Sequence, residues 1–457
     1  MTTVAIVGGG ITGLAAAREL ELRSSAEIVL LEASARIGGI IETLEMDGAV
    51  VEAGPDWFLT RTDAALEMCR ELGLADDLIV PDVIGANIYS GGRLRPLPDG
   101  FVRGFPASPR ALLRCRHLTV RGRIRALAEI TSRSPLDGPD VSLGEFTRTR
   151  FGTELLDRLV DPILAASRSG RPDELSLAAA APEIDTAARS GRSLLRSLRE
   201  DRVRGDGAPA FYGLRGGMSG LVHALASSLR RTEVRTSAPV RALRRAGTGW
   251  EVGAGDDALV VDRVILALPA FAAARLLAPV DGRVAAKLGR IPYAGAVVLS
   301  LLYPEGAADP PPGTSGVLIP STEGHILTAF AWYSAKWRQA RPRGGGMIVR
   351  CFVGRAAGDS ITEVPDAALV RGVAAELRDI AGVRGEPVAH ALTKREQALP
   401  VYRVGHLNLV DDIEGALPPH LVLAGAGYRG SGIPDCIGQG RAAAGRIMET
   451  TQKEAIR

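Results

Sequence analysis

The chain has 457 residues, 46% of them apolar, and carries a formal net charge of +3. Such a length predicts two or three domains, each large enough to hold a hydrophobic core. The near balance of acidic and basic residues argues against a nucleic-acid-binding protein.

Four cysteines are widely spaced and form no CxxC pair: Cys69, Cys115, Cys351 and Cys436. This spacing argues against a metal centre and a disulfide framework, and it favours a reducing cytoplasm. The first predicted strand begins at Val4, so we expect no secretory signal ahead of it. The longest apolar stretches, 264–274 and 294–303, are too short or too broken to cross a bilayer. We therefore expect a cytoplasmic protein, either soluble or peripheral on the inner face of the cell membrane.

A glycine motif organises the first forty residues. Residues 4–7 predict a buried strand, Gly8-x-Gly10-x-x-Gly13 a turn, and residues 14–20 a helix. That order distinguishes a dinucleotide-binding motif from a chance match. Gly8 permits the tight turn, Gly10 admits a pyrophosphate close to the backbone, and Gly13 lets the helix pack on the strand. The helix N-terminus offers N–H groups and partial positive charge to the phosphates.

A second apolar run, 28–31, ends in Glu32, which lies 19 residues past Gly13. A carboxylate at this point can accept hydrogen bonds from both hydroxyls of an adenosine ribose. Arg36-Ile-Gly-Gly39 follows, where a guanidinium and bare backbone can meet a second phosphate and a ribityl chain. This stretch resembles the two-glycine extension of the flavin oxidase superfamily that includes the amine oxidases. We therefore expect FAD rather than NAD.

The next segment changes in character along its length. Asp47-Gly48 predicts a hairpin turn, and residues 64–72 an amphipathic helix closed by Gly73. Residues 93–98 are expected to be extended and 110–204 helical. Seven arginines fall among leucines and alanines in the segment 103–125: Arg103, Arg110, Arg114, Arg116, Arg121, Arg123 and Arg125. Three interpretations stay open for this segment: a face for anionic lipid, a surface for a polycarboxylate substrate, or a solvated helix face.

The rest of the chain alternates predicted strands and helices. A helix is expected at 221–229, strands at 233–240, 264–268 and 421–425, and a last helix at 434–449. The pattern predicts an α/β protein with a discontinuous, Rossmann-like FAD-binding domain at 1–85, 206–270 and 405–457. A helical insertion at 86–205, a candidate for membrane association, and an α+β substrate-binding domain at 271–404 complete the expected architecture.

Several of these stretches together resemble the bacterial coproporphyrinogen/protoporphyrinogen oxidase family along nearly the whole chain. The stretches are Gly8 to Leu14, Glu52 to Arg61, Leu175 to Leu177, Ser334 to Trp337, Pro400 to His406 and Gly430 to Ile437. The first is common to many flavoproteins, whereas 334–337, 402–406 and 432–437 are more particular to this family. The resemblance implies an FAD-dependent, oxygen-using enzyme of haem biosynthesis that removes six electrons from a porphyrinogen in three two-electron rounds, with hydrogen peroxide as by-product. The composition is most similar to the Gram-positive branch, whose substrate is coproporphyrinogen III and whose product passes to the chelatase of the same pathway.

Carried onto this sequence, the resemblance implies cofactor contacts in five places. They are Gly8, Gly9, Gly10, Ile11, Thr12 and Gly13; Glu32, Ala33, Arg36, Gly38 and Gly39; Gly54, Pro55, Asp56 and Trp57; Val240; and Gly432, Ile433 and Pro434. A helix that opens at Pro434 would direct its N–H groups at the pyrimidine edge of a flavin and stabilise negative charge there.

The chain departs from the family pattern at several positions. Ile40 and Thr62 stand where basic residues are frequent, and Ser431 where an aliphatic residue is usual. Trp57 replaces a small residue, Arg168 is gained where an aromatic residue is lost, and Arg395 stands where the family tends to have a tryptophan near the flavin. The last three would change the size and charge of a cavity, so they bear on the substrate more than on the cofactor.

Coproporphyrinogen carries four carboxylates, so cations are expected around its cavity. The candidates are Arg61, Arg168, Lys336 and Arg395, although Lys336 is equally well interpreted as a strand-edge cation. No catalytic acid or base is predicted, because the protein's task is to orient a meso carbon and exclude water, and His406 is interpreted as structural. The alternatives are protoporphyrinogen IX as substrate, a related oxidase or desaturase acting on an amine or C–C bond of a secondary metabolite, and a flavin-bound partner without catalysis.

Overall fold

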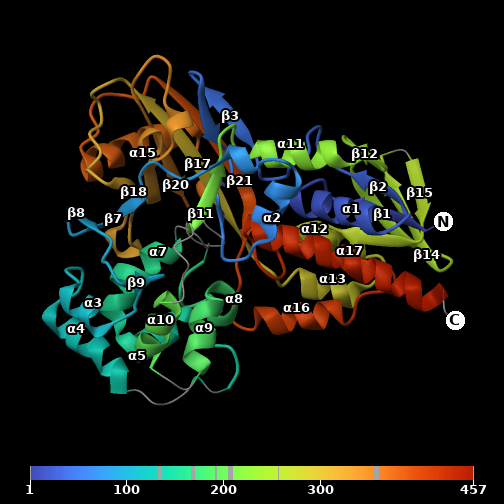
Figure 1. Ribbon diagram of the computed structural model, residues 1–457, viewed down its shortest axis with the longest axis horizontal. Coiled ribbons are helices and arrows are strands. Elements are labelled where there is room, and N and C mark those ends of the chain that lie inside the picture. Colours follow the sequence, from blue (N-terminus) through green and yellow to red (C-terminus); the bar gives the residue numbers. More distant parts are fainter. Residues whose placement is uncertain are drawn as a thin grey trace.

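The computed structural model describes residues 2–131, 136, 138–165, 170–190, 193–203, 209–255, 257–354 and 360–455. Three parts are visible in Figure 1: a Rossmann-like domain on the right, a sheet domain at the upper left and a helical domain at the lower left. The first and last parts of the chain both lie in the Rossmann-like domain (Figure 1).

A five-stranded parallel sheet forms the centre of the Rossmann-like domain. Its order is β12 (Thr232–Arg235), β2 (Glu27–Leu31), β1 (Thr3–Val7), β16 (Arg263–Leu266) and β22 (Leu421–Leu423). All neighbouring strands are parallel. The strands are rich in valine, isoleucine and leucine, as expected for a sheet that is covered on both faces. They come from three distant stretches, so the domain is discontinuous as predicted.

Two layers cover this sheet. A single hydrophobic core joins one face to α1 (Ile11–Arg23), α2 (Ala64–Glu71), α11 (Ser219–Ser228) and α17 (Ile433–Ala455). A second core includes the antiparallel strands β13 (Val240–Ala246), β14 (Gly249–Ala254) and β15 (Asp257–Val261), with α12 (Ala270–Leu277), α13 (Gly282–Leu288) and α16 (His406–Glu414). A Cβ on Gly440 would lie 2.3 Å from the Thr12 carbonyl oxygen, so α17 packs closely on the start of α1.

A seven-stranded sheet forms the second domain. Its order is β21 (Ala389–Pro400), β17 (Tyr293–Tyr303), β20 (Met347–Val353), β19 (Leu327–Trp332), β18 (Thr314–Leu318), β7 (Gly85–Ser90) and β8 (Arg93–Pro96). Helix α15 (Asp366–Ala381) shares a core with it, and α14 (Tyr333–Lys336) follows β19. The expected domain limits stay a prediction. Strands β7 and β8 come from around and within the segment expected as a helical insertion; in this sheet β7 pairs with β18 and β8 pairs with β7.

The helical domain begins with a short hairpin, β9 (Phe101–Val102) and β10 (Phe105–Pro106). Its helices are α3 (Pro109–Arg114), α4 (Val120–Leu127), α5 (Leu143–Phe151), α6 (Thr153–Leu155), α7 (Asp161–Ala165), α8 (Leu177–Ala180), α9 (Pro182–Arg189) and α10 (Leu194–Val203). In the described part of this domain, a hydroxyl accepts a hydrogen bond from a first-turn N–H group at the start of α3, α4, α5 and α8: Ser108, Thr119, Ser142 and Ser176. Such caps stabilise helix ends by about 1 kcal/mol each.

Small antiparallel elements connect the domains. The hairpin β3 (Thr43–Met46) and β4 (Ala49–Glu52) turns at Asp47 and Gly48, both at positive φ, as predicted. Strand β11 (Phe211–Leu214) pairs with β5 (Phe58–Leu59) and with β6 (Leu78–Ile79). The strand expected at 233–240 is wrong in extent, because Ser237 at φ 52° and Pro239 separate β12 from β13. Among the described residues, every helix is too short or too polar to span a bilayer.

Candidate cofactor and substrate site

The glycine turn lies between β1 and α1 and leaves open space at one glycine only. A Cβ on Gly8 would lie 2.4 Å from the Ala267 oxygen, and one on Gly13 would lie 2.0 Å from the Gly8 oxygen. A Cβ on Gly10 would have no neighbour within 4 Å. No side chain caps α1 at Gly10, so the N–H groups of its first turn, which includes Ile11 and Thr12, are directed at this open space.

Glu32 lies directly against the turn. One carboxylate oxygen accepts a hydrogen bond from the Gly9 N–H at 2.8 Å, and the other accepts bonds from the N–H and hydroxyl of Ser34. The Glu32 carbonyl accepts a bond from the Ala238 N–H, which brings the segment leading to Val240 beside Glu32 and Ala33. The carboxylate is thus oriented by backbone donors and keeps lone pairs for further donors.

The two-glycine loop packs against the same turn. The Gly38 N–H donates to the Gly9 carbonyl at 2.8 Å, and a Cβ on Gly39 would lie 3.4 Å from the Gly10 Cα. Gly38 and Gly39 both have positive φ, which explains the need for glycine. The Arg36 guanidinium donates to the Gly39 carbonyl at 2.7 Å and to the Glu42 carboxylate at 2.9 Å. Arg36 therefore fixes the shape of this loop.

A buried ionic cluster of Asp56, Lys336 and Arg350 joins the segment after β4 to the seven-stranded sheet domain. The Asp56 carboxylate accepts hydrogen bonds from Lys336 Nζ at 2.6 Å and Trp337 Nε1 at 2.9 Å, and it pairs with Arg350 at 3.0 Å. Burial would raise the pKa of Asp56, but Lys336 and Arg350 outweigh it and lower that pKa to about 2. A Cβ on Gly54 would lie 2.0 Å from the Ile40 oxygen, so this cluster abuts the two-glycine loop.

Glu52 and Arg350 are functional candidates that sequence reasoning missed. Arg350 is 1% exposed and donates to the backbone carbonyls of Glu52 and Gly54. The Glu52 carboxylate accepts a bond from the Met218 N–H at 2.7 Å, and burial raises its pKa to about 7. Nothing local in the sequence marks Arg350, because its partners lie almost 300 residues away.

The N-terminus of α17 contains the last group of predicted cofactor residues. The Gly432 N–H donates to the Asp435 carboxylate at 3.2 Å, and the helix begins at Ile433 and Pro434. Behind it, the Tyr402 hydroxyl donates to the Ala426 carbonyl at 2.5 Å. His406 Nε2 lies 2.7 Å from the Tyr428 carbonyl oxygen. His406 is 3% exposed and burial lowers its pKa, which agrees with a structural role.

The four substrate candidates lie at different places. Arg61 is 3.3 Å from Glu183 and 3.6 Å from Asp435, and it lines a cavity of about 220 Å³. Arg395 pairs at 3.1 Å with Glu42, the acid that also binds Arg36. Lys336 is paired with Asp56, and its Nζ lies 5.5 Å from the Trp57 ring centroid. Arg168 lies outside the described residues.

Several of the predicted cofactor residues lie next to one another around the glycine turn. Gly9 contacts Glu32 and Gly38, Ile40 contacts Gly54, and α17 contacts α1. Open space at Gly10, an oriented carboxylate and a second glycine loop suit a pyrophosphate, a ribose and a ribityl chain in turn. Pro55 and Trp57 flank Asp56 at the far end.

Comparisons with known proteins show which family the chain belongs to. The family of flavin containing amine oxidoreductases matches residues 11–448. The chain is 32% identical to the coproporphyrinogen III oxidase of Bacillus subtilis (strain 168), covering 96% of each chain, and 32% identical to that of Propionibacterium freudenreichii, covering 97% of this chain and 90% of the other. It is similar to the crystal structure of an Exiguobacterium sp. 255-15 protein provisionally named protoporphyrinogen oxidase, at 27% identity, 98% and 99% coverage and a TM-score of 0.88.

Proposed function

The chain belongs to the family of flavin containing amine oxidoreductases, and from this premise we propose that it is a coproporphyrinogen III oxidase. It is an FAD-dependent oxidoreductase. The substrate assignment rests on the 32% identity to the Bacillus subtilis enzyme of that name over 96% of both chains. The resemblance of the motifs at 334–337, 402–406 and 432–437 supports the same proposal.

Each part of the described surface has a role in this proposal. The first turn of α1 and Gly10 would hold the pyrophosphate, and Glu32, whose orientation is fixed by Gly9 and Ser34, would accept hydrogen bonds from the adenosine ribose hydroxyls. The loop shaped by Arg36 would support the ribityl chain, and the start of α17 would stabilise negative charge at the flavin. FAD, when bound, accepts two electrons and a proton from the substrate in each round.

The ionic cluster beside the cofactor surface has a structural role in this proposal, because its charged groups are buried and paired with one another. Asp56 stays charged because Lys336 and Arg350 lower its pKa, and Lys336 is held as its counter-ion. Trp57 covers Lys336 on one side, and Trp337 lies 5.1 Å from its Nζ on another. This arrangement keeps water from the junction of the two domains. Of the three described substrate candidates, Arg61 and Arg395 are more exposed than Lys336 and are the ones proposed to meet the substrate's carboxylates.

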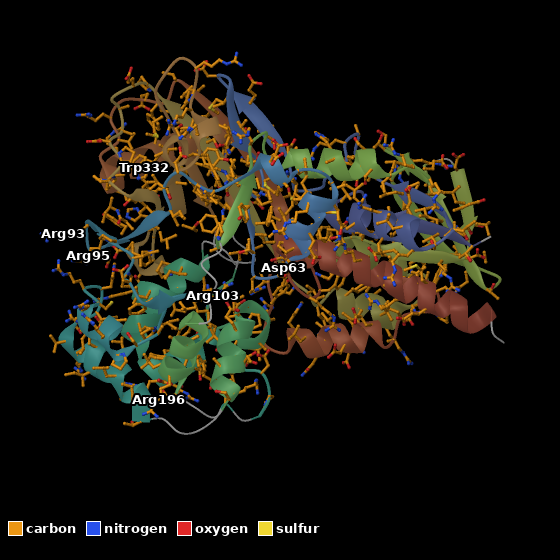
Figure 2. All side chains as sticks on the ribbon, viewed as in Figure 1. Asp63, Arg93, Arg95, Arg103, Arg196 and Trp332 are labelled. Atoms are coloured by element: carbon orange, nitrogen blue, oxygen red, sulfur yellow. The ribbon has the colours of Figure 1, made fainter. Side chains whose placement is uncertain are left out.

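Peripheral membrane contact is a further part of the proposal. Leu113, Val120 and Ile124 are 58%, 70% and 65% exposed on α3 and α4. The same helices also carry arginines, and Arg93 and Arg95 extend outward from β8 at the edge of the molecule (Figure 2). Exposed apolar side chains among basic ones suit the interface of an anionic bilayer.

The experiment that tests the proposed function measures two products at once. Flavin-loaded protein is given coproporphyrinogen III in air, and porphyrin fluorescence and hydrogen peroxide are followed together. We expect coproporphyrin III with about three peroxides per porphyrin, because six electrons leave in two-electron rounds. Protoporphyrinogen IX is the matched comparison and is expected to turn over more slowly. No oxidation of either porphyrinogen by flavin-loaded protein would refute the proposal and favour an oxidase of another metabolite.

A further inference from the structure

One carboxylate lies between two arginines from different parts of the chain. Glu183 is in the first turn of α9, and one of its oxygens is 3.3 Å from Arg61 Nη1. Its other oxygen pairs with Arg103 Nε. Arg61 follows β5 near the Rossmann-like domain, whereas Arg103 and Glu183 belong to the helical domain. Figure 2 labels Arg103 on the side of the helical domain that faces Asp63, which is two residues past Arg61.

Arg103 is held in a strained conformation. It lies at φ 49° and Gly104 at φ 86°, in the two-residue turn between the paired residues Val102 and Phe105. A bulky residue at positive φ is uncommon and costs about 1–3 kcal/mol unless its surroundings impose it. A Cβ on Gly104 would lie 2.9 Å from the Val160 Cα, so the turn is pressed onto the domain core. The fold therefore fixes the direction of Arg103 toward Glu183.

Arg61 is bound less firmly and lies at a cavity. Its contacts with Glu183 and Asp435, at 3.3 and 3.6 Å, are single and long compared with a bidentate arginine–carboxylate pair. The cavity of about 220 Å³ is also lined by Ala179, Tyr402 and Tyr428. Pockets that hold a whole drug-sized ligand measure about 300–1,000 Å³. This cavity is therefore suited to one side arm of a larger ligand.

We propose that Arg61 receives a carboxylate arm of the substrate, and that Glu183 is its resident counter-ion until the substrate binds. Arg103 then keeps Glu183 paired while Arg61 turns to the ligand. The inference rests on the proposed function, because it takes the ligand to be a porphyrin with several propionates. Without Arg103, binding would leave Glu183 as a partly buried carboxylate without a cation, which is costly. Asp435 keeps the Gly432 N–H as a partner in either state.

The test is a double-mutant cycle on porphyrin binding, which needs no turnover. Dissociation constants for coproporphyrin III are measured by fluorescence for wild type, Arg103→Gln, Glu183→Gln and the double variant. We expect Arg103→Gln to weaken binding by about tenfold or more, because Glu183, without Arg103, then competes with the porphyrin carboxylate for Arg61. Glu183→Gln should tighten binding, and the double variant should bind at least as well as wild type. Arg61→Gln should weaken binding in every background.

Further variants keep the proposal falsifiable. Arg103→Lys, which retains the charge, should bind nearly as wild type, and Arg121→Gln, an exposed arginine of α4, is the matched control. Flavin content and thermal midpoint verify folding. The inference would be overturned if Arg103→Gln weakened porphyrin binding equally in the wild-type background and in the Glu183→Gln background. It would also be overturned if Arg61→Gln left the dissociation constant unchanged. If wild type oxidises coproporphyrinogen while the cycle is additive, only this inference fails; if wild type neither oxidises nor binds porphyrin, the proposed function fails.

Discussion

Gly10 and Gly13 belong to one motif, yet the structure gives them different physical roles. A side chain at Gly13 would collide with the backbone of Gly8, so this glycine is needed for the fold itself. A side chain at Gly10 would meet only open space, and Gly10 has an ordinary extended conformation at φ −71°. Gly10 is therefore needed for what binds there.

Gly10→Val should separate folding from cofactor binding. We expect the variant to fold with a near-native far-ultraviolet circular dichroism spectrum and to contain no flavin, because the valine would occupy the place of the pyrophosphate. Flavin absorbance per protein, after incubation with FAD, measures the loss. Gly13→Val is the matched comparison and should not fold. Retained flavin in Gly10→Val would show that the turn is only structural.

Glu52→Gln should change how stability depends on pH. Burial raises the pKa of Glu52 to about 7, so between pH 4.5 and 7 the folded protein keeps a proton that the unfolded chain has lost. Wild-type stability should thus fall across this window relative to Glu52→Gln, by roughly 3 kcal/mol in total, and remain level above it. Urea unfolding of both proteins from pH 4.5 to 8 measures the difference. Parallel curves would contradict the raised pKa.

The residues that sequence reasoning found are those whose chemistry is local. The glycines of the first turn, Glu32 and the hairpin glycine Gly48 occupy positions that neighbouring residues determine, so pattern alone identifies them. Arg350 and the Arg103–Glu183 pair were missed as partners because their meaning depends on residues far along the chain. Lys336 was recognised as a cation, but only the structure shows that Asp56 is its counter-ion.

At the scale of elements, one short segment holds the loop before α17. The Tyr402 ring is stacked on His406 with centroids 4.3 Å apart, and both side chains contact backbone carbonyls of the loop 424–432. The segment 402–406 is also hydrogen-bonded to the helical domain: the Ser176 N–H donates to the Tyr402 carbonyl, and the Gly405 N–H donates to the Asp140 carboxylate. The loop is thus tied to two domains.

Tyr402→Phe should loosen this loop and weaken cofactor binding. The change leaves the Ala426 carbonyl without its hydroxyl donor, at a cost of about 1–3 kcal/mol. If most of this cost falls on the FAD-bound state, affinity for FAD should drop by about five- to a hundred-fold. Titration of the apoprotein with FAD measures the change. Tyr428→Phe is the control, since its hydroxyl makes a longer bond, 3.3 Å, to Leu268. Equal affinities for wild type and Tyr402→Phe would contradict this role.

Element types were more predictable than element boundaries and pairings. The 434–449 helix was predicted, although α17 extends over Ile433–Ala455. The expected strand 233–240 was too long because periodicity does not register the positive φ of Ser237. The pairing of β7 with β18 joins residues more than 200 positions apart, and no local pattern encodes it.

At the scale of the whole molecule, the exposed apolar residues and the arginines of α4 together predict that the protein binds anionic vesicles and that salt weakens this binding. Binding to anionic vesicles should fall steeply with salt, because charges are screened within about 10 Å at 0.1 M. Replacing Val120 and Ile124 by serine should abolish it. Serine at Val260, which is also 70% exposed but lies on β15, is the control. Sedimentation with vesicles measures binding; binding that survives molar salt, or none at any salt, would refute the electrostatic contact.

The discontinuity of the parallel sheet has a consequence for synthesis on the ribosome. Strand β1 pairs with β16 at Val4 and Arg263, and β22 and α17 close the same core only near residue 421 and beyond. At about 5–20 residues per second, β1 and α1 leave the ribosome roughly 10–50 s before β16 does. During that interval β1 has β2 beside it on one edge but lacks β16 on the other, and α1 lacks α17, so the nascent chain is expected to need a chaperone. The start of α17 is the last part of the cofactor surface to emerge, so FAD is captured as a late step of folding rather than as a template for it.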